Sequence, residues 1–340
     1  MKDRPADSVR RKMSQKASDV SRPSLLCAGI LVADIFVPPL PALPEAGQLL
    51  ATEDFLIDTG GCAANVAAGL AKLGAAVAVA GKVGKDAFGD FIIHELAVRG
   101  IDTSHVARSE VAGTSKTVVL PVVGQDRRFI HTFGANAELT VSEIAGSLSA
   151  ATRILYVGGY LIMPGVRRDA LADLLRGVRE RGIRTMLDVA VPRAGDASME
   201  ALDPVLPYVD YFLPNDEEAR ALTGETEPRR QAERFIAAGC GTAIVTQGDR
   251  GTLLMDAGRV LEAPVFPVEY VDGSGAGDAF AAGFLFGLSE GWPADESLRF
   301  ASAVGASACR RLGCTTGVFT RADAEALLQR QPLAIRETRR

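Results

Sequence analysis

The sequence has 340 residues, of which 47% are hydrophobic, so it holds enough apolar side chains for one large globular domain. The formal net charge of −5 argues against a surface whose main task is to bind nucleic acid. The five cysteines are scattered and form no CxxC pair of the metal-binding type, which favours reduced thiols and a cytoplasmic location.

The two ends of the chain are expected to lie outside the folded domain, which then covers residues 24–330. Residues 1–23 are polar and of mixed charge, without the apolar core of a signal peptide, and this predicts a disordered tail. Residues 331–340 are expected to form a second loose tail. No stretch of the sequence has the apolar length that a membrane span needs.

Predicted strands and helices alternate along most of the chain. Short apolar runs predict buried strands at 25–28, 77–80, 153–157, 183–187, 208–213 and 242–246. Apolar residues at helical spacing predict helices at 63–73, after Asp86, at 166–181, from 216 and at 228–238. This alternation predicts an α/β fold with a mainly parallel sheet that helices cover on both faces.

Two segments interrupt the alternation. Residues 35–57 contain four prolines and no helical stripe, and residues 114–133 alternate like a strand pair around a turn at Gly124-Gln125-Asp126. We expect these segments to form a small β-rich lid, and the alternative is two ordinary surface loops.

The strongest local motif is Asp272-Gly-Ser-Gly-Ala-Gly-Asp278, which runs directly into an apolar helical stripe that begins at Phe280. A glycine turn at a helix N-terminus exposes free N–H groups and the positive end of the helix dipole, so it can bind an anion. A carboxylate beside such a site is the base that phosphoryl transfer to a hydroxyl needs. The alternative is a glycine turn in which Asp278 only caps the helix.

Two other phosphate-binding motifs are not matched. The glycine spacing differs from the G-x-G-x-x-G of dinucleotide-binding folds, and the motif lies near the C-terminus. Gly81-Lys82 is followed by Val83 and not by Ser or Thr, so there is no Walker A loop.

The Asp272–Phe280 segment resembles the C-terminal signature of the ribokinase-like (PfkB) carbohydrate kinases. Three further segments resemble motifs of that family and follow its order: Gly60-Gly61-Cys-Ala-Ala-Asn65 with Gly81–Gly89, Asn215-Asp-Glu-Glu218, and Thr246-Gln-Gly248 with Gly251. The resemblance extends from Leu25 to about Leu328. It implies the ribokinase-like three-layer α/β/α sandwich and an ATP-dependent kinase that phosphorylates a sugar or sugar-like substrate.

The resemblance also implies roles for individual residues. Asp278 would be the catalytic base, and the backbone of Gly275, Ala276 and Gly277 would form the anion hole. ATP would be bound by Asn215, Glu218, Thr246, Gly248, Gly251 and Ser302. Glu218, with Asn215, would organise Mg²⁺ through water, and Asp272, Ser274 and Gly313 would hold a monovalent cation such as K⁺.

The substrate residues that the resemblance implies are Asp34, Gly60, Gly61, Asn65, Tyr160 and His131. The residues alone leave other readings open, since Asp34 could be a turn residue, Asn65 a helix N-terminal residue and His131 an ordinary surface histidine. The partners implied are small molecules, without nucleic acid or membrane, and a second copy of the chain bound through the lid.

The motifs do not identify the substrate. Val32, Cys62 and Tyr160 stand where ribokinases carry polar groups, which suits a less polar ligand such as a nucleoside whose base stacks on Tyr160. A nucleoside kinase is therefore the alternative to a sugar kinase. Two hypotheses come from other functional classes: a catalytically inactive binding protein and a dinucleotide-dependent oxidoreductase.

Overall fold

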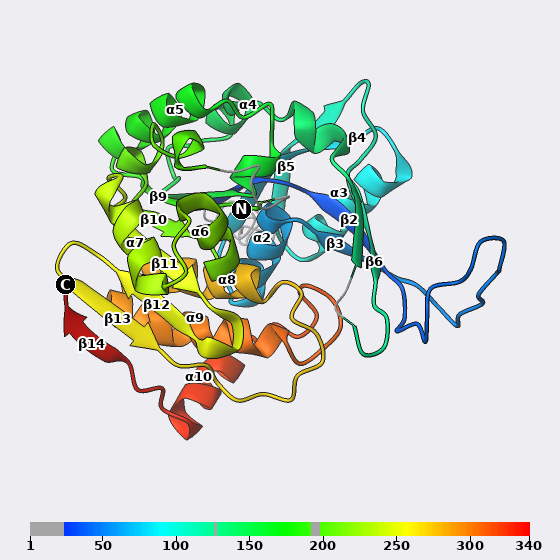
Figure 1. Ribbon diagram of the computed structural model, residues 1–340. Helices are drawn as coiled ribbons and strands as arrows, with labels where there is room; N and C mark the ends of the chain where they lie inside the picture. The colour runs from blue at the N-terminus through cyan, green and yellow to red at the C-terminus, as the bar shows by residue number, and fades with distance from the viewer. Residues whose placement is uncertain (1–23, 126–127, 192–197) are drawn as a thin grey trace, which may run out of the picture.

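The computed structural model describes residues 24–125, 128–191 and 198–340, so the predicted tail at 1–23 and the turn residue Asp126 lie outside the described residues. In this part of the chain, ten strands form one large sheet with the order β14-β13-β12-β11-β10-β9-β8-β1-β4-β5 (Figure 1). The strands are β1 (Leu25–Gly29), β4 (Val77–Gly84), β5 (Asp102–Ser109), β8 (Ile154–Gly158), β9 (Arg184–Asp188), β10 (Tyr211–Leu213), β11 (Thr242–Thr246), β12 (Thr252–Met255), β13 (Arg259–Ala263) and β14 (Arg336–Arg339). Neighbours from β11 to β5 pair in parallel, whereas β12, β13 and β14 pair antiparallel.

Helices cover both faces of this sheet. They are α2 (Cys62–Lys72), α3 (Ala87–Val98), α4 (Val141–Gly146), α5 (Arg168–Glu180), α6 (Asp216–Thr223), α7 (Pro228–Ala237), α8 (Ala276–Ser289), α9 (Ala294–Ala308) and α10 (Arg321–Arg330). Short 3₁₀ turns lie at Gly134–Glu138, Tyr160–Ile162, Met199–Ala201, Leu206–Tyr208 and Gly248–Arg250. Alternate residues of β1 enter two different hydrophobic clusters, Leu25 and Cys27 on one face and Leu26 and Ala28 on the other. The predicted three-layer sandwich is therefore confirmed.

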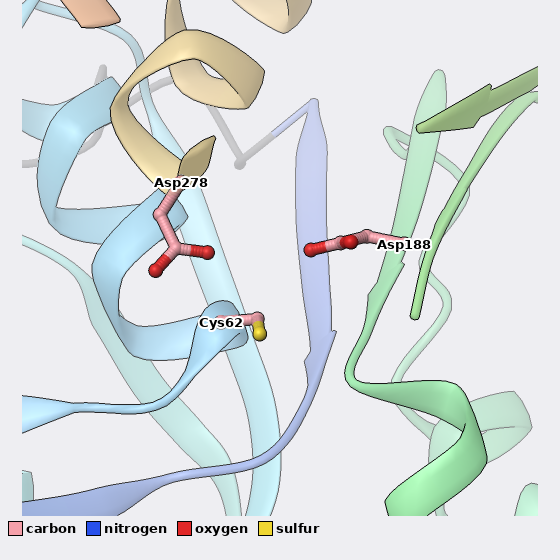
Figure 2. Close-up of side chains that lie close together, drawn as sticks. All are labelled: Cys62, Asp188 and Asp278. Atoms are coloured by element: carbon pink, nitrogen blue, oxygen red, sulfur yellow. The ribbon is translucent and has the colours of Figure 1, made fainter. Parts of the chain in front are cut away.

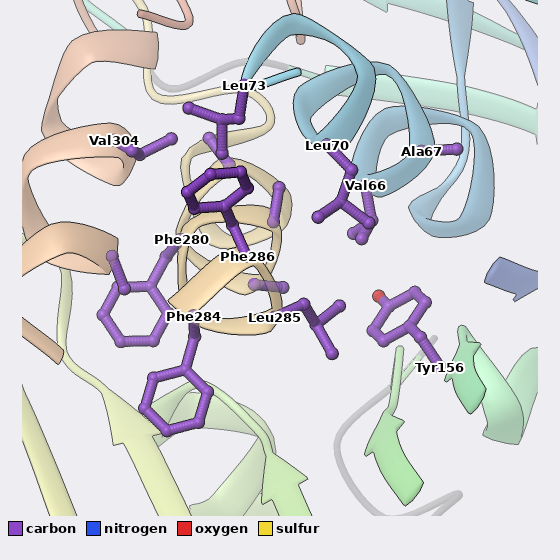
Figure 3. Close-up of a cluster of buried hydrophobic side chains, with 14 of the residues drawn as sticks. Val66, Ala67, Leu70, Leu73, Tyr156, Phe280, Phe284, Leu285, Phe286 and Val304 are labelled. Atoms are coloured by element: carbon purple, nitrogen blue, oxygen red, sulfur yellow. The ribbon is translucent and has the colours of Figure 1, made fainter. Parts of the chain in front are cut away.

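Helix α8, which follows the glycine motif, is buried along most of its length. Its side chains Phe280, Phe284 and Leu285 pack in the cluster that Figure 3 shows between α2 and α9. Gly283 allows α9 to approach closely, because a Cβ at this position would lie 2.8 Å from the Cα of Ala301. A helix that is apolar on all sides belongs in the core, and this packing fixes its N-terminus and the glycine turn.

The two segments that interrupt the α/β pattern meet in a second, four-stranded sheet. It has the order β3-β2-β6-β7 and comprises β2 (Val32–Phe36), β3 (Leu56–Gly60), β6 (Lys116–Leu120) and β7 (Arg128–Thr132). This sheet lies at one side of the main domain, and the loop between β2 and β3 projects beyond it (Figure 1). The expectation of one β-rich element, and not two separate loops, is confirmed.

Several details of the prediction were wrong. The C-terminal residues are not loose throughout, because Arg336–Arg339 forms β14, which pairs with β13 and is held by a hydrogen bond of 2.7 Å from Arg336 Nε to Glu262. The strand expected at 208–213 begins only at Tyr211, since residues 206–208 form a 3₁₀ turn with Pro207 near its start. Among the described residues, no helix combines the length and apolarity of a transmembrane span.

Candidate active site

Asp278 lies in the first turn of α8, where the sequence places it beside the glycine turn. Its Oδ2 accepts a hydrogen bond of 2.8 Å from Nδ2 of Asn65, which comes from α2. Burial raises the pKa of Asp278 to about 6, and hydrogen bonds from Asn65 and Cys62 limit the increase. A carboxylate with this pKa is mostly ionised at neutral pH and can take up a proton readily.

The glycine turn has a geometry that only glycine at position 275 permits. Gly275 caps α8 in the left-handed conformation with φ 72°, and a Cβ there would overlap the carbonyl oxygen of Cys314. Gly277 is different, because a Cβ there would meet no atom within 4 Å. The first turn of α8 therefore borders open space at Gly277, whereas the N–H of Ala276 donates to the carbonyl oxygen of Gly273 at 3.3 Å.

Two groups that the sequence analysis did not identify as functional lie next to Asp278. The Sγ of Cys62 and one carboxylate oxygen each of Asp188 and Asp278 lie within 4.8 Å of one another. Figure 2 shows these side chains facing a common space from the start of α2, the end of β9 and the start of α8. Tyr156, in β8, donates a hydrogen bond of 2.7 Å to Asp188 Oδ2. Burial raises the pKa of Asp188 well above its ordinary range, and the charges of Glu218 and Asp278 raise it further.

Asn215 and Glu218 form a capping box at the start of α6. Asn215 Oδ1 accepts from the backbone N–H of Glu218 at 2.8 Å, and Glu218 Oε2 accepts from the backbone N–H of Asn215 at 2.9 Å. Burial raises the pKa of Glu218 to about 7, the bond from Asn215 opposes this change, and the charge of Asp278 adds to it. The charge of Asp278 thus raises the pKa of both Asp188 and Glu218, and such a group of close carboxylates can bind a cation.

A cavity of about 680 Å³ adjoins the glycine turn. It is lined by four of the six residues predicted for ATP, Thr246, Gly248, Gly251 and Ser302, together with Gly273, Ala276 and Gly277 of the turn. The other two, Asn215 and Glu218, are not among its lining residues. Aromatic and aliphatic side chains complete its walls, among them Phe266, Val268, Tyr270 and Phe280. A cavity of this size, with apolar walls next to the backbone of the glycine turn, has room for a nucleotide.

Asp34 comes from a different part of the fold, β2 of the four-stranded sheet. Only 8% of it is exposed, and burial raises its pKa to about 6. Gly60 lets the carboxylate approach its backbone, since a Cβ there would overlap Asp34 Oδ2. The charge of Asp34 raises the pKa of Asp278, so the two carboxylates belong to one site. Asn65 Oδ1 is buried without a hydrogen-bond partner among the described residues.

Gly61 begins α2 at φ 87°, where a Cβ would lie within 3 Å of the backbone of Ile30. In the strand register, Gly60 lies opposite Val32, two residues before Asp34. The residues predicted to hold a monovalent cation, Asp272, Ser274 and Gly313, also lie together. Ser274 donates from its backbone N–H and its hydroxyl to Asp272 Oδ1, at 3.2 and 3.0 Å, and Gly313 N–H donates to Asp272 Oδ2 at 3.3 Å.

The stacking role considered for Tyr160 was wrong. Tyr160 is 4% exposed and packs in the hydrophobic cluster that contains Leu26 and Ala28 of β1. It donates its hydroxyl hydrogen to the carbonyl of Ala201 at 3.2 Å. Its ring therefore has no free face for a ligand. His131 lies on β7, where its Nδ1 is 3.0 Å from Thr117 Oγ1, and its contact with a substrate stays a prediction.

Comparison with known sequences supports the resemblance to one family. The model of the pfkB family carbohydrate kinases matches residues 23–321. The ribokinase of Bacillus subtilis is 30% identical over 286 residues, which cover 84% of this chain and 92% of that relative. The adenosine kinase of Saccharomyces cerevisiae is 28% identical over 282 residues, or 78% of this chain and 82% of that relative.

Comparison with solved structures gives the same result. The ribokinase of Arabidopsis thaliana, complexed with ribose and ATP, has a TM-score of 0.77 and 25% sequence identity to this chain. The match covers 91% of this chain and 99% of that structure. This chain therefore belongs to the pfkB family of carbohydrate kinases.

Proposed function

We propose that this protein transfers the γ-phosphoryl group of ATP to a hydroxyl of a sugar or sugar-like substrate. The observation that carries the proposal is that Asp278 directly follows Gly277, which lines the cavity, and lies close enough to Asp34 for the charge of that carboxylate to raise its pKa. A nucleotide in the cavity would direct its terminal phosphate toward the N-terminus of α8. A hydroxyl compound held by Asp34 would reach the same point from the other side.

The steps follow from the chemistry of these groups. The substrate hydroxyl would donate its proton to Asp278 while its oxygen attacks the γ-phosphorus and the bond to ADP breaks. The N–H groups of Gly275, Ala276 and Gly277 would stabilise the negative charge on the transferred group. Asn65 would hold Asp278 in place through its bond of 2.8 Å.

The donor set at Asp278 also fits Mg²⁺, which prefers oxygen ligands. Asp188 and Glu218 would hold the ion, directly or through water, and a cation would offset both the burial and the neighbouring charges that raise their pKa values. When bound, Mg²⁺ would neutralise charge on the phosphates.

The acceptor would be a polyol, because Asp34 offers two acceptor oxygens and no donor when it is ionised. The unpaired Oδ1 of Asn65 would accept from a further hydroxyl. A nucleoside kinase stays the second candidate, since the adenosine kinase relative matches most of the chain. A nucleoside also presents adjacent ribose hydroxyls, so the same acceptors would serve it.

The test is ADP release by the purified protein with Mg·ATP and a panel of sugars, deoxy sugar acids and nucleosides. We expect turnover on at least one hydroxyl compound and its loss in Asp278→Asn. If no compound increases ADP release above the rate with ATP alone, the proposed activity is wrong. Turnover on nucleosides and not on sugars would select the second candidate.

We also propose a requirement for a monovalent cation at Asp272 and Ser274. The carboxylate and hydroxyl oxygens at the start of the glycine turn, together with the 3.3 Å bond to Gly313, would let a cation fix the anion hole. Replacement of K⁺ by tetramethylammonium at constant ionic strength should lower kcat. Equal rates in both salts would contradict the requirement.

The outer face of the four-stranded sheet supports a dimer through the lid. Its register places Ile57, Ile35, Val118 and Ile130 in one apolar row, in which Ile57 and Ile130 are 46% and 63% exposed. Sedimentation should find a dimer that Ile130→Glu dissociates, whereas Val111→Glu, on an exposed loop residue, should leave it intact. A wild-type protein that is monomeric at all concentrations would contradict the proposal.

A further inference from the structure

The inner face of the four-stranded sheet carries a row of four polar side chains. In the strand register, Asp58 opposes Asp34, Asp34 opposes Thr117, and Thr117 opposes His131. Directly opposed residues on neighbouring strands project from the same face of a sheet, so we call these four residues the polar row. This face is turned toward the main domain, because Phe36 and Val119 on it pack against Cys314.

The hydrogen bonds within the polar row have a defined direction. Thr117 lies directly opposite Asp34 in the strand register, and hydrogen bonding by its hydroxyl lowers the pKa of this carboxyl, against the larger effect of burial. An ionised carboxylate can only accept, so Thr117 must donate its single hydroxyl hydrogen to Asp34. Thr117 Oγ1, which lies 3.0 Å from Nδ1 of His131, must then accept from an Nδ1–H. The row thus favours the Nδ1–H tautomer of His131.

The other neighbours of Asp34 cannot replace the Thr117 hydroxyl. Asp58 is an acceptor and is itself bound by Arg99, whose NH2 group lies 2.9 Å from Asp58 Oδ1. Gly60 has no side chain, and the Cys314 thiol, at 3.8 Å from Asp34 Oδ2, is a weak donor. The Thr117 hydroxyl is therefore the donor that can orient the Asp34 carboxylate. The contact with His131 in turn fixes the orientation of that hydroxyl.

We propose that Thr117 and His131 are positioning residues, which orient the Asp34 carboxylate toward the substrate hydroxyls, with His131 acting through the Thr117 hydroxyl. This rests on the proposed function of Asp34 as the substrate-binding carboxylate. It assigns to His131 an indirect role, in place of the direct substrate contact that the sequence suggested.

A double-mutant cycle on KM tests the route of this effect, with whichever substrate the panel identifies. Thr117→Val should raise KM about 10- to 100-fold, because it removes a hydrogen bond to a charged group. His131→Ala should raise KM about 2- to 10-fold, and it should have no further effect in the Thr117→Val background. Thr117→Ser, which keeps the hydroxyl, should restore the wild-type KM within about twofold.

The matched control is Thr132→Val, a change of the same type on the opposite face of β7, which should leave KM unaltered. If the effects of Thr117→Val and His131→Ala multiply, His131 acts on the substrate directly and the proposal is wrong. An unchanged KM in Thr117→Val would also overturn it.

A second measurement needs no substrate and separates this inference from the proposed function. The chain has only three histidines, so long-range ¹H–¹⁵N spectra can be assigned with the His131→Ala variant. We expect His131 to be the Nδ1–H tautomer in the wild type and to lose this preference in Thr117→Val. A dominant Nε2–H tautomer in the wild type would refute the polar row, whereas the expected tautomer with no kinase activity would refute only the proposed function.

Discussion

Replacing Asp278 by Asn should separate the activity of this protein from its stability. Asn keeps the shape of the side chain and can still accept from Asn65, but it cannot take a proton from a hydroxyl. A positioned general base contributes about 10²–10⁴ in rate, so kcat should fall by this factor while ATP still binds. With a pKa of about 6, Asp278 is about 90% ionised at pH 7 and about 10% at pH 5. Wild-type kcat should therefore fall about tenfold between these pH values.

The same change should stabilise the fold at neutral pH. A carboxyl whose pKa rises from 3.8 to about 6 on folding gives up its proton less readily in the folded state. At 1.36 kcal/mol for each pKa unit, its ionisation costs the folded state at most about 3 kcal/mol above pH 6. This cost shrinks as the pH falls through 6 and is lost below 3.8, where the carboxyl becomes protonated in the unfolded state as well. Asp278→Asn should thus raise the free energy of unfolding at pH 7 and have little effect at pH 4.

The assay combines initial rates of ADP release at pH 5 and pH 7 with urea unfolding at pH 4 and pH 7. Asp169→Asn is the matched control, because Asp169 also lies in the first turn of a helix but is exposed. It should change neither rate nor stability. Near-normal turnover in Asp278→Asn, or a wild-type rate that does not change between pH 5 and 7, would refute the assignment of Asp278 as the base.

Four further substitutions test other parts of the site. Asp34→Ala should raise KM strongly and lower kcat, and an unchanged KM would show that Asp34 is only structural. Gly277→Val should fold, since no atom lies within 4 Å of the new Cβ, but its kcat should fall by about 10²–10³. Gly275→Ala should lower the melting temperature, because the new Cβ would overlap Cys314. Glu218→Gln should raise the Mg²⁺ concentration for half-maximal rate, and an unaltered Mg²⁺ dependence would exclude Glu218 from the ion's shell.

The sequence predicted the parts of the site that depend on local geometry. The glycine turn before Asp278 and the Asn215–Glu218 motif are each encoded in a few consecutive residues at a helix start, where the structure has a left-handed glycine and a capping box. Asp34 and Asn65 needed the family resemblance, since a single Asp or Asn after an apolar run is also an ordinary turn or cap residue.

Contacts between distant elements could not be predicted in this way. Asp188 has no motif around it, and its role follows only from β9 ending opposite α8, 90 residues further along the chain. Tyr160 was misassigned because the direction of its ring depends on the hydrophobic cluster around it. Strand β14 was missed because it forms on the open edge of β13, with its own charged residues exposed.

The alternation within β6 makes the lid sensitive to strand slippage. Thr117 faces Asp34 on the inner side, whereas Val118, the next residue, belongs to the apolar outer row. A shift of one residue between β2 and β6 would place an isopropyl group beside the buried carboxylate and expose the hydroxyl to solvent. Deletion of one residue in β6 would therefore damage both faces at once, while insertions in the exposed β2–β3 loop would leave this register intact.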